Sequence, residues 1–222
     1  MKMFFAAAAA LLMATSAHAA LITVDDFNTI QLSTDNRADG VAVSNTVAYT
    51  VGGNLFTRTV AVDQTQHSGT DPRLSSTANI GFGTLKLSND SQTNATFNLS
   101  YDIDSLVDDV AGNSGLTLDV LFTDAAAGTP FTIAGYLNDI LLGSGTFAGP
   151  GMLSLSLPEL AASGNQLRLM FTGGTAYDAE LGPISLQVDA TEVPEPATLG
   201  LLGLGLLAVG AARRRRKTVA AA

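Results

Sequence analysis

Apolar and polar side chains alternate with a period of two along most of the chain between residues 20 and 192. In the clearest stretch, residues 96–103, an apolar side chain occupies every odd-numbered position. Such alternation predicts half-buried β-strands. We expect strands at residues 22–27, 41–51, 56–62, 74–87, 96–103, 116–122, 131–137, 153–157, 167–169 and 184–188. The 74–87 segment should break near Gly81, Phe82 and Gly83, because glycines favour turns.

The predicted strands, about ten in number, are short and separated by frequent turns. No stretch between them sustains the 3.6-residue spacing of apolar residues that is typical of a helix. This organisation predicts an all-β protein with an antiparallel β-sandwich. A jelly roll is favoured over an immunoglobulin-like module, which needs only about 100 residues. Two brief segments, 105–110 and 158–162, are each expected to form one helical turn.

The first 19 residues have the features of a secretory signal peptide. Lys2 precedes an apolar core, and Ala17-His18-Ala19 has the small-x-small spacing that signal peptidase accepts. We therefore expect delivery through the secretory translocon and cleavage after Ala19. The body of the protein, residues 20–192, should then form one exported β-sandwich domain.

The C-terminus predicts the same topology independently. The motif Val193-Pro194-Glu195-Pro196 is followed by an uncharged apolar run at 197–212. The basic tail that follows consists of Arg213, Arg214, Arg215, Arg216 and Lys217. Basic residues flanking an apolar segment stay on the cytoplasmic side of a membrane, which places the body outside. A 16-residue helix is roughly 24 Å long and spans a ~30 Å hydrocarbon core only marginally. A transient transmembrane helix is therefore favoured, and an ordinary C-terminal membrane anchor is the alternative.

These three C-terminal parts, in this order, resemble the PEP-CTERM sorting signal of Gram-negative, biofilm-forming bacteria, a region also called the ice-binding protein C-terminal domain. The resemblance covers residues 193–217. It implies that a membrane-embedded exosortase recognises Pro194, Glu195 and Pro196, removes the tail and leaves the protein at the cell surface or in extracellular polymeric substance. The resemblance implies nothing about what the exported domain binds.

The charge of the body excludes some partners. Residues 20–192 contain 19 of the 20 acidic residues and five of the 11 basic ones, a net charge of minus 14. Nucleic acid is not expected as a partner, because binding a polyanion needs clustered cations. Cysteine is absent from the chain, which excludes thiol catalysis and thiolate metal sites.

Acidic residues suggest one kind of metal chemistry. Asp102, Asp104, Asp108 and Asp109 could bring several hard oxygen ligands together around a structural Ca²⁺ ion. The spacing does not match an EF-hand, and a solvated acidic loop is the alternative. A second candidate group combines residues 25, 26 and 189, provided that the first and last strands are neighbours. No other cofactor is expected.

Catalysis has little support in the sequence. His67 has no accompanying nucleophile elbow, and glutamate is scarce in the body, so no serine hydrolase or glycosidase site is evident. The Thr23–Phe27 segment is similar to the first strand of exported carbohydrate-binding jelly rolls. Such modules bind sugars on aromatic platforms, and the chain contains no tryptophan and four tyrosines: Tyr49, Tyr101, Tyr136 and Tyr177.

The sequence therefore predicts a non-enzymatic, exosortase-processed protein of the cell surface or extracellular matrix. Its role would be structural or adhesive in biofilm, with exopolysaccharide as a candidate partner. A carbohydrate-binding or calcium-dependent adhesion module is the second hypothesis, and a secreted hydrolase is the third.

Overall fold

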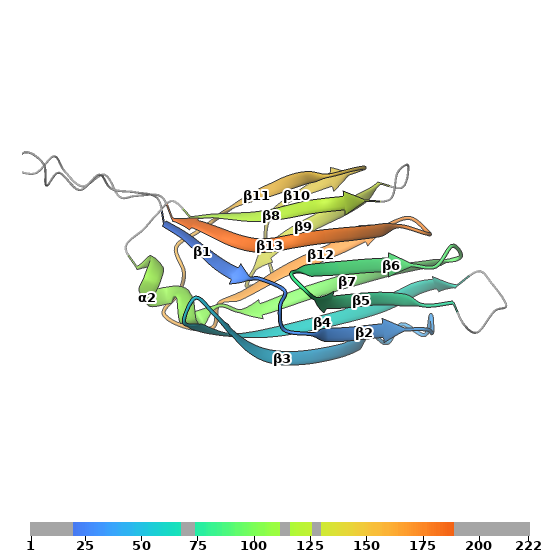
Figure 1. Cartoon of the computed structure of the whole chain (residues 1–222), viewed down its shortest axis with the longest axis horizontal. Helices are drawn as coiled ribbons and strands as arrows, with labels where there is room; N and C mark the ends of the chain where they lie inside the picture. Colours follow the sequence, from blue (N-terminus) through green and yellow to red (C-terminus); the bar gives the residue numbers. More distant parts are fainter. Residues whose placement is uncertain (1–19, 68–73, 112–115, 126–129, 189–222) are drawn as a thin grey trace, which may run out of the picture. The chain divides into compact units, whose positions relative to one another are not determined.

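The computed structural model describes residues 20–67, 74–111, 116–125 and 130–188 (Figure 1). The predicted signal peptide and the whole C-terminal sorting segment lie outside these residues. Within them, the structure contains no helix with the length and apolar character needed to cross a membrane.

The described residues form two antiparallel sheets packed face to face (Figure 1). Sheet A contains, in spatial order, β11 (Gly151–Leu157), β8 (Leu116–Ala125), β13 (Asp178–Val188), β6 (Thr84–Asn89), β5 (Ser76–Gly81) and β2 (Gln31–Asp35), and β1 (Ala20–Asp25) also pairs with β13. Sheet B contains β10 (Ile140–Phe147), β9 (Phe131–Leu137), β12 (Gln166–Gly173), β7 (Thr93–Asp102), β4 (Asn54–His67) and β3 (Val43–Val51). The predicted antiparallel β-sandwich is confirmed, and its jelly-roll subtype stays a prediction.

Every strand expected from alternation is present, and the break between β5 and β6 falls at the expected glycine turn. The helical turn expected at 105–110 is also present, as η2 (Asp104–Leu106) and α2 (Val107–Val110). The turn expected at 158–162 was wrong, because these residues form no helix. His67 is the last residue of β4.

Two strands escaped the sequence analysis. β2 is only five residues long and turns Gln31, Ser33 and Asp35, not apolar residues, toward the interior. β10 contains Gly143 and Gly145 in place of apolar residues. A Cβ at position 145 would lie 2.9 Å from the Phe147 ring, so packing excludes a side chain there.

The core lies between the inward faces of the two sheets. Its aromatic centre consists of Phe122, Phe131 and Phe147, whose ring centroids lie 4.6–6.0 Å apart. Burying one such side chain contributes about 1.5–3 kcal/mol. Because both sheets supply these residues, the apolar core holds the two sheets together without disulfides.

β1 and β6 pair with the same edge of β13, one after the other along the strand. Pro183 lies at the change of partner, where the register shifts between Leu181 and Ile184. Proline lacks an N–H group and therefore suits a point where the ladder is interrupted. At the far end of β1, Ala20 pairs with Val188. The first and last described strands are thus neighbours, as the second calcium hypothesis assumed.

Candidate functional site

The residues predicted to direct sorting lie outside the described part of the chain. These are Pro194, Glu195 and Pro196 of the motif, and the basic residues 213–217. Their assignment therefore depends on the sequence comparison reported below.

The predicted calcium ligands lie where β7 ends and the short helices begin. Both carboxylate oxygens of Asp104 accept hydrogen bonds from the β11–β12 loop: Gly164 N at 2.7 Å, Asn165 N at 2.7 Å and Asn165 Nδ2 at 2.8 Å. These backbone donors lower the pKa of the Asp104 carboxyl below its usual value. Asp104 therefore fastens η2 to this loop.

The other three acids are arranged separately. Asp102 Oδ1 accepts a hydrogen bond from Asp104 N at 3.1 Å. Asp109 Oδ2 accepts one from Asn54 Nδ2 at 2.8 Å, and Asp108 is exposed. Across the described residues, no three acidic or histidine side chains are grouped so that they could hold a metal ion. Calcium binding by these aspartates stays a prediction.

The second calcium hypothesis is wrong at Asp25. Asp25 is fully buried, and its carboxylate contacts Arg58 Nη1 at 2.6 and 2.9 Å and the Tyr101 hydroxyl at 2.8 Å. Phe27 N donates a further hydrogen bond at 2.8 Å. Burial raises the pKa of the Asp25 carboxyl, and the Arg58 guanidinium opposes that rise. Because both oxygens already have partners inside the core, Asp25 cannot serve as a surface metal ligand.

Three of the four tyrosines cannot form a binding platform. Tyr49, Tyr101 and Tyr177 are buried in the core. Burial raises the pKa of the Tyr101 hydroxyl well above its usual value, so this hydroxyl stays protonated and donates to Asp25. Tyr136 alone among the four is partly exposed, on the outer face of sheet B.

Tyr136 lies beside Arg168, a basic residue that was not among the candidates drawn from the sequence. The register of β9 and β12 places Tyr136 opposite Arg168. The guanidinium lies 4.2 Å from the centre of the Tyr136 ring, and its Nη2 lies 3.0 Å from Asp139 Oδ1 in the β9–β10 turn. Both residues are out of phase with the apolar positions of their strands. The alternation of side chains along each strand could therefore have identified both residues as outward-facing.

The surface around this pair is unusually poor in charge. We call it the threonine face, defined by the outward-facing residues Thr46, Thr57, Thr59, Thr96, Thr132, Thr146 and Thr172 of sheet B. Hydroxyl pairs join neighbouring strands at 2.8 Å (Thr46 and Thr59) and 2.9 Å (Thr132 and Thr146). Among the described outward positions of sheet B, only Asp63, Asp102 and Arg168 carry charge. A body with a net charge of minus 14 thus presents one broad face of hydroxyl groups.

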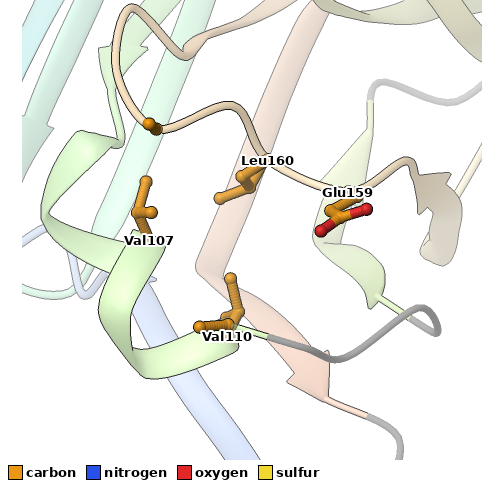
Figure 2. A pocket seen from close by; sticks show the side chains of 6 residues that line it. Val107, Val110, Glu159 and Leu160 are labelled. Carbon is orange, nitrogen blue, oxygen red and sulfur yellow. The ribbon is translucent and has the colours of Figure 1, made fainter.

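A pocket lies between α2 and the β11–β12 loop (Figure 2). Its volume is ≈ 280 Å³, and it is lined by Val107, Val110, Ala111, Glu159, Leu160 and Ala162. Figure 2 shows aliphatic side chains around the opening with one carboxylate, Glu159, at its side. Ligand sites usually combine an apolar wall with several convergent polar groups. The threonine face, with Tyr136 and Arg168, is therefore the better candidate.

Comparisons with known proteins identify the C-terminal segment. A family model described as "PEP-CTERM protein-sorting motif" matches residues 192–216. This segment is therefore a PEP-CTERM sorting motif, as predicted, and it implies exosortase processing and a destination at the cell surface. No curated protein matches the chain.

Several solved structures are similar to the sandwich at low identity. One, titled "CBM4 structure and function", has a TM-score of 0.35 and 11% identity and covers 58% of this chain and 87% of its own. A family 11 carbohydrate-binding module from Clostridium thermocellum, in complex with a β-1,3-1,4-mixed-linked tetrasaccharide, has a TM-score of 0.34 and 13% identity, with 80% and 99% covered. TmCBM61 in complex with β-1,4-galactotriose has a TM-score of 0.33 and 12% identity, with 74% and 91% covered. A similarity at these TM-scores does not indicate which ligand, if any, this chain binds.

Proposed function

We propose that this protein is exported, processed at both ends and delivered to the cell surface or extracellular polymer, where the sandwich acts as a non-enzymatic structural or adhesive domain. The match of residues 192–216 to a sorting motif is the observation that carries the proposal. The last described strand ends at Val188, so the motif follows the sandwich almost directly.

The N-terminal and C-terminal segments of the chain each have a role in this proposal. Signal peptidase removes residues 1–19 after translocation. The exosortase recognises Pro194, Glu195 and Pro196, while residues 213–217 hold the apolar segment in place from the cytoplasmic side. The apolar segment is a short, temporary anchor that the sorting reaction removes.

The sorting step is tested by Glu195→Ala in a host that carries the exosortase. We expect the variant to remain membrane-associated at its full C-terminal mass, while the wild type is released or surface-attached in shortened form. Glu192→Ala is the matched control, since it removes a nearby acid outside the Pro194-Glu195-Pro196 sequence and should be processed normally. Normal processing of the Glu195 variant would contradict the assignment, and intact-mass analysis reports both termini.

A second candidate function is binding of a neutral polysaccharide on the threonine face. It is favoured by the partly exposed pair of Tyr136 and Arg168, which lies within a surface of hydroxyl and amide groups. Sugars bind through apolar stacking on planar groups together with hydrogen bonds to hydroxyls. A neutral polymer suits this face, because the net charge of the body repels polyanions.

Retention of the protein on insoluble neutral glucans and galactans tests this candidate. Tyr136→Ala should abolish retention, because it removes the single exposed tyrosine ring among the four. Phe82→Ala removes an exposed aromatic side chain from the β5–β6 turn and should leave retention unchanged. Equal retention of both variants, or none by the wild type, would rule the candidate out.

We also propose that a structural Ca²⁺ ion stabilises the domain for adhesion. Its ligands would come from Asp102, Asp104, Asp108 and Asp109. The expected result is a rise in melting temperature with CaCl₂ that EDTA reverses. Asp108→Asn should reduce the rise, because this exposed carboxylate is free to reorient toward an ion. An unchanged melting curve would exclude the site.

A further inference from the structure

β3 forms one edge of sheet B. Within the described residues it pairs only with β4, and β4 continues the sheet to β7 (Figure 1). The strand is nine residues long, and most of its side chains are exposed or half-buried. An edge strand presents unpaired main-chain groups that can take another strand.

The hairpin that joins β3 to β4 shows which groups are free. Gly52 and Gly53 form a two-residue turn closed by the pair Val51 and Asn54. In such a hairpin the closing pair is hydrogen-bonded, and hydrogen-bonded pairs then alternate with non-bonded ones. The N–H and C=O groups of Ser44, Thr46, Ala48 and Thr50 therefore point away from β4.

The sequence of β3 lacks the residues that protect an edge, although side-chain hydrogen bonds connect it to β2 in the other sheet. Its sequence, VSNTVAYTV, contains no charged residue, proline or glycine. β10, at the other edge of sheet B, has a bulge between Leu141 and Gly143 and contains two glycines. Bulges twist an edge away from a potential partner. The two edges of the same sheet thus differ in their capacity to pair.

We propose that β3 pairs antiparallel with β3 of a second copy of this chain, so that sheet B continues across a two-fold axis. Val47 lies on the axis, Thr46 pairs with Ala48 of the partner, and Ser44 pairs with Thr50. This register uses all four residues that present free main-chain groups. Shifting it by two residues leaves one of them unpaired on each copy.

Charge restricts the place at which two copies of this chain can meet to an uncharged strand such as β3. The body carries a net charge of minus 14, so most of its surface repels another copy. The proposed register places only hydroxyl, amide, aromatic and aliphatic side chains opposite one another, and like charges opposite one another would destabilise such pairing. The contact is self-complementary, as a two-fold interface requires. It depends on neither the sorting step nor sugar binding.

Disulfide trapping tests the register in the full-length protein, which has no cysteine of its own. Val47→Cys brings two Cα atoms to about 4.5 Å in a non-hydrogen-bonded pair, within the range of a disulfide. We expect most of this variant to form a covalent dimer under mild oxidation. Ser144→Cys, an exposed position on β10, is the control and should stay monomeric. Equal cross-linking of the two variants, or none at position 47, would overturn the proposal.

A charge placed on the edge tests the same contact without cross-linking. The double variant Thr46→Lys with Ala48→Lys should weaken dimerisation by at least about tenfold in sedimentation experiments, because it sets four ammonium groups together at the contact. Ser144→Lys should dimerise like the wild type. All three side chains face outward, but Thr46→Lys also removes the hydroxyl pair with Thr59, so the double variant should melt slightly lower and Ser144→Lys like the wild type. A wild type that is monomeric at high concentration, or that forms open-ended polymers, would refute pairing through β3.

Discussion

Arg58 and Asp25 form a fully buried ion pair, 2.6 Å between Nη1 and Oδ2, that connects the two sheets of the sandwich. Arg58 belongs to β4 of sheet B, and Asp25 ends β1 of sheet A. Arg58 Nε also donates to Gln31 Oε1 at 2.7 Å, and its Nη2 donates to Thr29 O at 2.7 Å. The pair therefore fixes the β1–β2 connection against the opposite sheet.

Removing one partner of this pair should be costly. Arg58→Met leaves the Asp25 carboxylate buried without a counter-charge, and we expect the free energy of unfolding to fall by about 3–5 kcal/mol. Lys86→Met, in the exposed pair with Glu180, should cost no more than about 1 kcal/mol. Denaturant unfolding monitors both variants. Losses of similar size would show that burial does not set the contribution of the Arg58 pair.

Gly173→Ala should destabilise the protein through a collision with an aromatic ring. A Cβ at this position would lie 2.6 Å from Cδ1 of Tyr177, whose ring is stacked on Phe131 and cannot move freely. We expect a loss of about 1–3 kcal/mol, typical of overpacking. Gly149→Ala is the control, because nothing lies within 4 Å of the added Cβ. Thermal unfolding of the two variants should separate them clearly.

The Asp104 contacts predict a specific pH dependence. Hydrogen bonds from the Gly164 and Asn165 backbone lower the pKa of Asp104 in the folded state below its ordinary value of 3.8. The folded state therefore binds this proton less readily than the unfolded state, so the stabilisation is complete above the unfolded pKa and is lost as pH falls through the folded one. Asp104→Asn should melt lower than the wild type near pH 6, and the difference should shrink below about pH 4. Asp108→Asn, which changes an exposed acid nearby, is the control and should melt like the wild type near pH 6.

Phe82→Asn should stabilise the β5–β6 hairpin. Phe82 has a φ of 55°, its side chain is 94% exposed, and Gly83 follows with a φ of 84°. Asn-Gly is favoured in two-residue turns where both residues have positive φ. We expect a gain of about 0.5–1 kcal/mol, because the left-handed conformation is strained for phenylalanine. Phe82→Ala removes the same exposed ring without this relief, and an equal gain from it would contradict the backbone explanation.

Local sequence features predicted most of the strands and part of the candidate site. The alternation in residues 96–103 marks Tyr101 as inward, and the same reasoning applied to β9 marks Tyr136 as outward. Side-chain direction alternates with every residue of a strand, so neighbours along the chain carry this information. β2 was missed because its inward residues are polar and find their partners on β3 and β4.

The sequence by itself determined the terminal sorting motif and the antiparallel β-sandwich, because both are written in short-range patterns of charge, hydropathy and turn residues. Tertiary structure decided which polar residues are buried and which remain at the surface. Asp25 and Arg58 are 33 residues apart, and only the packing of one sheet on the other turns a candidate metal ligand into one half of an internal ion pair. The position of β3 as the last strand of sheet B among the described residues was likewise decided by strand order, since the alternation that predicts a strand is the same for central and edge strands.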